Sequence, residues 1–149
     1  MQRRKFLSLG AAAAAVSVLP ASLSATDFRA TAPKAWEAPS SREAIEALFG
    51  SSKMIEGKIE IKAPKLAENG GAVPISVKSE MMLTTIAIFQ DANPRSAVAV
   101  IESEGGMSDM TTKIKMRKSA NVTVVAKGAD GKLYSAVQKV EVSIGGCGG

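Results

Sequence analysis

The chain contains no histidine, only one cysteine, and few aromatic residues, which make up 4% of its 149 residues. Ser-His and Cys-His hydrolysis and histidine-ligated zinc all require an imidazole, so the sequence excludes these classes. No disulfide can form within the chain, because there is no second cysteine. Six prolines and thirteen glycines are too few for a disordered or collagen-like protein, and 46% of the residues are hydrophobic. We therefore expect one folded domain with no metal and no cofactor.

Residues 1–25 have the three-part layout of a secretory signal. The pair Arg3 and Arg4 precedes an apolar segment, residues 6–19, and small residues follow it. As a helix this segment spans about 21 Å, which is shorter than the roughly 30 Å hydrocarbon core of a membrane. We expect it to be cleaved rather than kept as an anchor. The paired arginines indicate a twin-arginine signal and predict a periplasmic protein.

The net charge of +5 comes largely from this signal, because 16 basic and 14 acidic side chains remain without it. The only cation cluster left is formed by Lys113, Lys115, Arg117 and Lys118, with no aromatic residues among them. In a strand the first three would share one face, which we interpret as solvated. We therefore expect no nucleic-acid binding.

Residues 26–54 are interpreted as an irregular leader that contains one short helix. Ser40 and Glu43 form a capping box, apolar residues then recur on one helical face, and Gly50 stands where a C-cap glycine belongs. The pattern predicts a helix over residues 41–49. A helix of this length can only cover or brace a larger unit.

Residues 55–144 change to a period of two, which is typical of half-buried strands. The alternating apolar residues are Ile59, Ile61; Val73, Ile75, Val77; Ile86, Ile88; Val98, Val100; Ile114, Met116; Val122, Val124; and Val140, Val142, Ile144. Turn residues separate these runs, namely Glu68-Asn69-Gly70-Gly71, Asp91-Ala92-Asn93-Pro94, Glu104-Gly105-Gly106 and the hairpin signal Asp130-Gly131. About seven short strands predict an all-β fold, specifically an immunoglobulin-like antiparallel β-sandwich. Pro74 cannot donate to a ladder, so we place its strand at an edge.

The chain ends in Gly145-Gly146-Cys147-Gly148-Gly149. Glycine loses the most entropy on ordering and has no side chain to pack, so residues 145–149 are interpreted as a flexible arm. Five residues reach at most about 17 Å, enough to carry a sulfur atom into another protein's cleft. An unpaired cysteine in an exported protein is a partner for another chain or a reactive group, and its thiolate is the nucleophile. We expect the preceding strand residues Val140, Val142 and Ile144 to anchor the arm, with Gly145 and Gly146 as its swivel.

The twin-arginine-type signal, the all-β domain and the terminus around Cys147 together resemble the SoxY family, the sulfur carriers of the bacterial Sox thiosulfate-oxidation system. The resemblance implies that Cys147 is the covalent attachment site for thiosulfate and that the chain is not itself an enzyme. It implies loading by a c-type cytochrome, release of sulfate by a hydrolase and, in some systems, oxidation by a sulfur dehydrogenase. It also implies a heterodimer with a second β-sandwich subunit, SoxZ.

Other roles for the single thiol remain open from the sequence. Cys147 could hold two exported chains together through a structural interchain disulfide, which an oxidising periplasm would permit. A ubiquitin-like carrier also ends in Gly-Gly, but its ATP-dependent activation takes place inside the cell. An adhesion or copper-binding module of immunoglobulin type would not depend on the cysteine.

Overall fold

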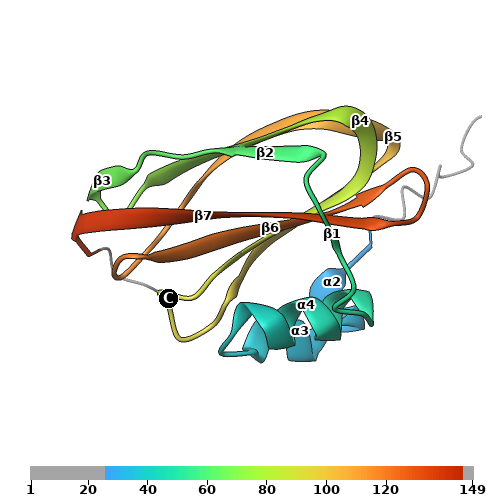
Figure 1. Ribbon diagram of the computed structural model, residues 1–149. Coiled ribbons are helices and arrows are strands. Elements are labelled where there is room, and N and C mark those ends of the chain that lie inside the picture. The colour runs from blue at the N-terminus through green and yellow to red at the C-terminus, as the bar shows by residue number, and fades with distance from the viewer. Residues whose placement is uncertain (1–25, 146–149) are drawn as a thin grey trace, which may run out of the picture.

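The computed structural model describes residues 26–145, which form three short helices followed by seven strands (Figure 1). The helices are α2 (Phe28–Thr31), α3 (Pro33–Glu37) and α4 (Ser41–Phe49). The strands are β1 (Ile55–Glu56), β2 (Ile59–Lys62), β3 (Leu66–Asn69), β4 (Val73–Gln90), β5 (Ala97–Ile114), β6 (Ala120–Gly128) and β7 (Leu133–Ile144). None of the described helices is long and apolar enough to cross a membrane. The prediction of a mostly β chain with a short N-terminal helix is confirmed.

The strands belong to one mixed sheet with the order β1-β7-β6-β4-β2, to which β3 is added on β7 and β5 on β4. Both β1 and β3 run parallel to β7, and the other pairs are antiparallel. The expected purely antiparallel arrangement is therefore wrong. The two parallel strands have only two and four residues, which is too few for a period-two pattern to reveal them. The immunoglobulin-like class itself stays a prediction.

Two long strands replace four of the short strands expected from the sequence. β4 and β5 have 18 residues each; β4 contains two of the predicted alternating runs, and β5 contains one run and the first residue of the next, Ile114. Register shifts between Lys78 and Thr85 bend β4, so that its first half pairs with β2 and its second half with β6. Figure 1 shows β4 and β5 arching together at this bend. The expected turn at Gly105 and Gly106 lies inside β5, because the irregular pairing accommodates these residues without ending the strand.

The main core lies between the two halves of β4 and the inner faces of β6 and β7. Its fully buried members include Val73, Ile75, Val77, Ile86, Ile88, Val122, Val124 and Val140. Pro74 is exposed and pairs with Lys113 of β5, and β4 as a whole is an internal strand, so the edge prediction is correct only locally, at the proline itself. The pairing of β2 stops at Ser76, so β4 has no neighbour on that side at the proline.

The helix over residues 41–49 is confirmed at both ends. The Ser40 hydroxyl accepts a hydrogen bond from the Glu43 amide at 3.3 Å, and Gly50 closes the helix in the left-handed region at φ 68°. α4 packs its buried Ala44 and Ile45 over the outer face of the sheet, in a second core cluster that includes Phe89 of β4. This helical layer lies on one side of the sheet in Figure 1.

The leader before α4 is helical rather than irregular, which corrects the prediction for it. The two short helices α2 and α3 form there, because the Asp27 side chain caps α2 and Pro33 occupies the first turn of α3. The Trp36 indole donates to the Phe28 carbonyl at 3.0 Å, and the Arg29 guanidinium lies 4.3 Å from the centre of the indole ring. Such short helices carry little periodicity, so contacts between them stabilise what the pattern could not indicate.

The Asp130-Gly131 hairpin between β6 and β7 is confirmed. Gly131 has a φ of 80°, which favours glycine, and Asp130 accepts hydrogen bonds from the Lys132 amide at 2.9 Å and the Tyr134 hydroxyl at 2.6 Å. The Tyr134 bond is the main cause that lowers the pKa of Asp130 from its ordinary value. The same bond raises the pKa of Tyr134, because it stabilises the protonated hydroxyl that donates it.

We expect an absorbance titration to find the pKa of Tyr134 above the ordinary value of about 10, and to find it lower in Asp130→Asn. Tyr134 is the only tyrosine, so the signal reports this residue alone. Asn-Gly keeps the hairpin turn but removes the charge. The contact stabilises the hairpin at intermediate pH: the Asp130 contribution is lost as pH falls through its lowered pKa, and that of Tyr134 as pH rises through its raised pKa. Equal midpoints in the two proteins would contradict the assignment.

Candidate functional site

The residues predicted to carry the chemistry fall largely outside the described part of the chain. These are Cys147 with its neighbours Gly146, Gly148 and Gly149, together with Arg3 and Arg4 of the predicted signal. The structure does describe Gly145 and everything that precedes it from residue 26. It therefore defines the place from which the predicted arm leaves, which we call the arm root: the end of β7, Gly145 and the segments that touch them.

The end of β7 is held by backbone hydrogen bonds to segments distant in the sequence. β3 runs alongside it, with Asn69 opposite Ile144. The Gly70 amide donates to the Ile144 carbonyl at 2.8 Å, and the Val142 amide donates to the Ser119 hydroxyl at 2.8 Å. Each of these bonds satisfies a backbone group of β7, so the strand is fixed up to its last residue.

The side chains of β7 lose contact with the core toward this end. Val140 is fully buried and Val142 partly buried, whereas Ile144 is 71% exposed. The side chains of Val140 and Val142 therefore contribute to anchoring the arm root, whereas Ile144 does so only through its backbone. Alternation suggested an inward position for it, but the strand ends where the core ends, and its backbone provides the attachment instead.

Gly145 lies directly against the backbone carbonyl of Arg117. A Cβ atom at this position would overlap the Arg117 oxygen far inside any van der Waals contact. The φ of Gly145 is not positive, so the position requires glycine for its small size and not for its backbone conformation. What the structure describes at Gly145 is this close backbone contact, so its role as a swivel stays a prediction, and the role predicted for Gly146 lies outside the described residues.

The segment that contains Arg117 is itself held by hydrogen bonds to Gly70 and Asn93. Gly70 connects it to β7, since its carbonyl accepts from the Met116 amide at 2.7 Å while its amide binds Ile144. The Asn93 side chain accepts from the Arg117 amide at 2.9 Å and donates to the Lys115 carbonyl at 2.8 Å. The sequence indicated Asn93 only as a turn residue. No local pattern could have revealed a contact made across 24 positions of the chain.

Cations gather at the arm root. Lys113, Lys115, Arg117 and Lys118 are all exposed, and they alternate with the buried Ile114 and Met116. Within residues 26–145 the only ion pair joins Lys139 and Glu141 at 3.6 Å, so none of these four cations is paired with a carboxylate described there. The predicted solvated face is present. What the sequence did not indicate is that this face borders the exit of the arm.

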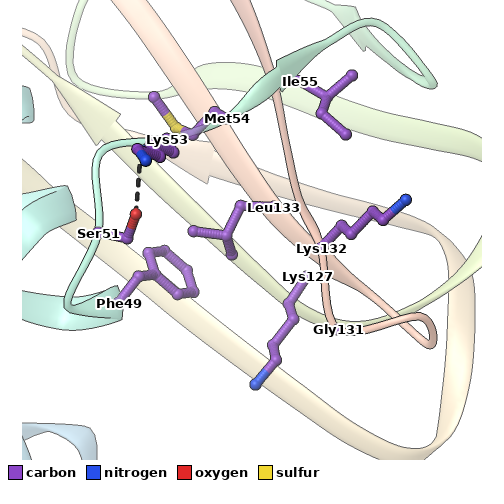
Figure 2. Close-up of a pocket in the computed structure, with 9 residues that line it drawn as sticks. All are labelled: Phe49, Ser51, Lys53, Met54, Ile55, Lys127, Gly131, Lys132 and Leu133. Atoms are coloured by element: carbon purple, nitrogen blue, oxygen red, sulfur yellow. Dashed lines mark hydrogen bonds between the residues drawn. The ribbon is translucent and has the colours of Figure 1, made fainter.

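An open pocket of about 450 Å³ lies near the other end of the sheet, beside the β6–β7 hairpin (Figure 2). It is lined by apolar Phe49, Met54 and Leu133 among other residues, and Lys127 and Lys132 extend outward from its wall in Figure 2. No three Asp, Glu or Cys side chains gather as metal ligands in the part of the chain that the structure describes. The pocket contains no paired acid and base groups, and its hairpin residues stand at the start of β7, whereas the arm root lies at the end of that strand.

Comparison with known proteins places these features in context. A protein-family model described as "Sulfur oxidation protein SoxY" matches residues 45–147. The solved structure of the sulfur carrier protein SoxY from Chlorobium limicola f thiosulfatophilum is 40% identical, with a TM-score of 0.59, and the match covers 68% of this chain and 94% of that one. A superoxide reductase from Ignicoccus hospitalis shares the fold alone, with 15% identity, a TM-score of 0.51 and coverage of 58% and 81%. No match is found among curated protein sequences.

Proposed function

Because the chain belongs to the SoxY family of sulfur oxidation proteins, we propose that it is a carrier that binds thiosulfate-derived sulfur covalently on Cys147 and presents it to partner enzymes. The observation that carries this proposal is the extent of the family match, which runs to residue 147 and so includes the one cysteine of the chain. The related structure that matches over most of its length is described as a sulfur carrier protein.

The proposed loading step joins two sulfur atoms. The Cys147 thiolate and thiosulfate form a sulfur–sulfur bond, giving Cys–S–S–SO₃⁻, and two electrons leave to a c-type cytochrome. Water then attacks the terminal sulfonate group in a partner hydrolase, releasing sulfate and two protons and leaving Cys–S–S⁻. In systems with a sulfur dehydrogenase, this remaining sulfur is oxidised further.

The proposal assigns no catalytic group to the chain itself. The sequence has no histidine to act as a base near neutral pH, and the described residues contain no cluster of potential metal ligands. Gly145 and the end of β7 are instead held in one place, so a short terminal segment would start from a defined point on the surface. Tethering the cargo there gives each docked enzyme a high local concentration of substrate.

Location and partners complete the proposal. Residues 1–25 would direct the folded protein through the twin-arginine route to the periplasm, and residues 145–149 would form the sulfur-carrier arm. The strands of residues 55–144 would bind a SoxZ-like subunit in a heterodimer, with residues 26–54 covering one side of the sheet. The enzymes that load and unload Cys147 would dock onto this complex.

Mass spectrometry of the protein isolated from cells supplied with thiosulfate tests the carrier role. We expect adducts on Cys147 with the masses of added sulfur and of added thiosulfonate, which disappear after treatment with a thiol reductant. Cells grown without thiosulfate provide the control. If Cys147 is found only in a disulfide between two chains under both conditions, the structural alternative is correct and the carrier proposal is wrong.

A further inference from the structure

The arm root places positive charge beside the start of the predicted arm. The Arg117 carbonyl touches Gly145, and the Gly70 bridge joins the same segment to the last residue of β7. Lys115 and Lys118 flank Arg117, and all three side chains are exposed. Their position is therefore fixed by backbone contacts, while their long side chains stay free to move toward a nearby charge.

Cys147 follows Gly145 by two residues, so chain geometry limits the separation of their Cα atoms to about 7 Å. Gly145 touches the Arg117 backbone, so the Cys147 Cα atom can lie no more than about 7 Å beyond the residue that contacts the cationic segment. This limit follows from covalent lengths alone and holds for every conformation of the terminal residues.

The proposed cargo is anionic at each stage. The thiosulfonate adduct carries one negative charge on its terminal group, and the sulfur left after release of sulfate is also anionic. Planar arginine and mobile lysine side chains bind such oxyanions well, and no carboxylate in the described residues is paired with them. The charge of the site therefore complements the charge of what it would hold.

We propose that Lys115, Arg117 and Lys118 form an anion-binding cluster that attracts thiosulfate-type anions to Cys147 and retains the loaded group beside the arm root. This inference rests on the proposed function for the identity of the cargo. The geometric part rests on the described contacts of Gly145, Gly70 and Arg117. In this proposal the chain contributes to loading in two ways, by providing the thiol and by attracting the anion that reacts with it.

The test uses two thiol reagents of different charge on the purified mature protein. Tetrathionate is a dianion that transfers a thiosulfonate group to a thiolate, forming Cys–S–S–SO₃⁻ and releasing thiosulfate, without any enzyme. 4,4′-Dithiodipyridine is a neutral disulfide that reports the intrinsic reactivity of the same thiolate. The ratio of the two rate constants measures attraction of the anion and cancels differences in thiolate fraction.

We expect the triple variant K115Q/R117Q/K118Q to lower this ratio about tenfold at 0.01 M ionic strength, where the Debye length is about 30 Å, and only about twofold at 1 M, where it is about 3 Å. The matched control K53Q/K127Q/K132Q removes the same net charge at the distant pocket of Figure 2 and should change the ratio less than about twofold. All six side chains are on the surface or at the pocket rim, so both variants should fold.

A single variant of opposite sign strengthens the test. Glu68 is exposed in β3 next to Asn69, which is the residue paired with Ile144. Glu68→Gln should therefore raise the ratio by about twofold at low salt. An equal decrease in both triple variants would mean that only net charge matters, and an unchanged ratio in K115Q/R117Q/K118Q would mean that the cluster does not act on Cys147; either result overturns the inference. A decreased ratio together with no adduct in cells would support the cluster and contradict the carrier role.

Discussion

Replacing Cys147 with serine is expected to abolish sulfur loading completely. The hydroxyl has no thiolate form near neutral pH and cannot make a sulfur–sulfur bond, so no adduct can form anywhere on this chain, which has a single cysteine. Thiosulfate-dependent electron transfer to the cytochrome, reconstituted with the partner proteins, should fall to the background without carrier. Intact-mass analysis of the same samples should show no added sulfur.

A variant that keeps a single thiol but moves it to another residue tests whether the position of the thiol matters in addition to its reactivity. Ser143 is exposed on β7, four residues before the cysteine and on the part of the strand that is held by backbone bonds. S143C/C147S should react with a small alkylating reagent yet fail to support turnover, because its thiol cannot be presented beyond the surface. Turnover near the wild-type rate in either variant would contradict the proposed attachment site.

Gly145→Val is expected to have the largest structural effect at the arm root. The new Cβ would overlap the Arg117 carbonyl, so one of the two segments must move. The hydrogen bonds of Gly70 to Ile144 and to Met116 would then weaken. We expect a loss of about 1–3 kcal/mol in the free energy of unfolding, as for other overpacked sites. Amide hydrogen exchange should show reduced protection at Gly70 and Met116.

Gly105→Ala provides the matched control for this variant. A Cβ at Gly105 meets nothing within 4 Å, and the residue does not have a positive φ. It should therefore leave both the unfolding free energy and the exchange pattern nearly unchanged. If Gly145→Val gives wild-type protection at Gly70, the close contact with Arg117 does not fix the arm root.

The sequence predicted those parts of the fold whose signals are local. α4 was predicted with both ends correct, because Ser40 and Gly50 bind or bend the backbone of their own helix. The Asp130-Gly131 hairpin was predicted for the same reason. The sequence did not predict that β5 continues through Gly105. Two adjacent glycines favour a turn unless a distant strand supplies pairing partners on either side of them. Strand pairing is a nonlocal property, and composition alone does not fix it.

The candidate site was likewise predicted only in part from the sequence. The chemistry was predicted from the terminal residues, since a single thiol between glycines after a strand leaves few roles for Cys147. The surroundings were not predicted. Lys115 and Arg117 follow a strand pattern that is ordinary for a solvated face, and their relation to Gly145 depends on Gly70 and Asn93, which the sequence indicated only as turn residues.

The sequence by itself determined which atom we propose as the attachment site, because the chain has a single thiol and this reactivity belongs to the identity of a side chain. The tertiary structure alone decided what surrounds the start of that terminal segment. Bonds from Gly70, which follows β3, and from Asn93, which follows β4, join the segment after β5, and the Gly70 bond also reaches the end of β7. Such contacts depend on the packing of the whole sheet, so the cations at Arg117 become neighbours of Gly145 only once the protein has folded.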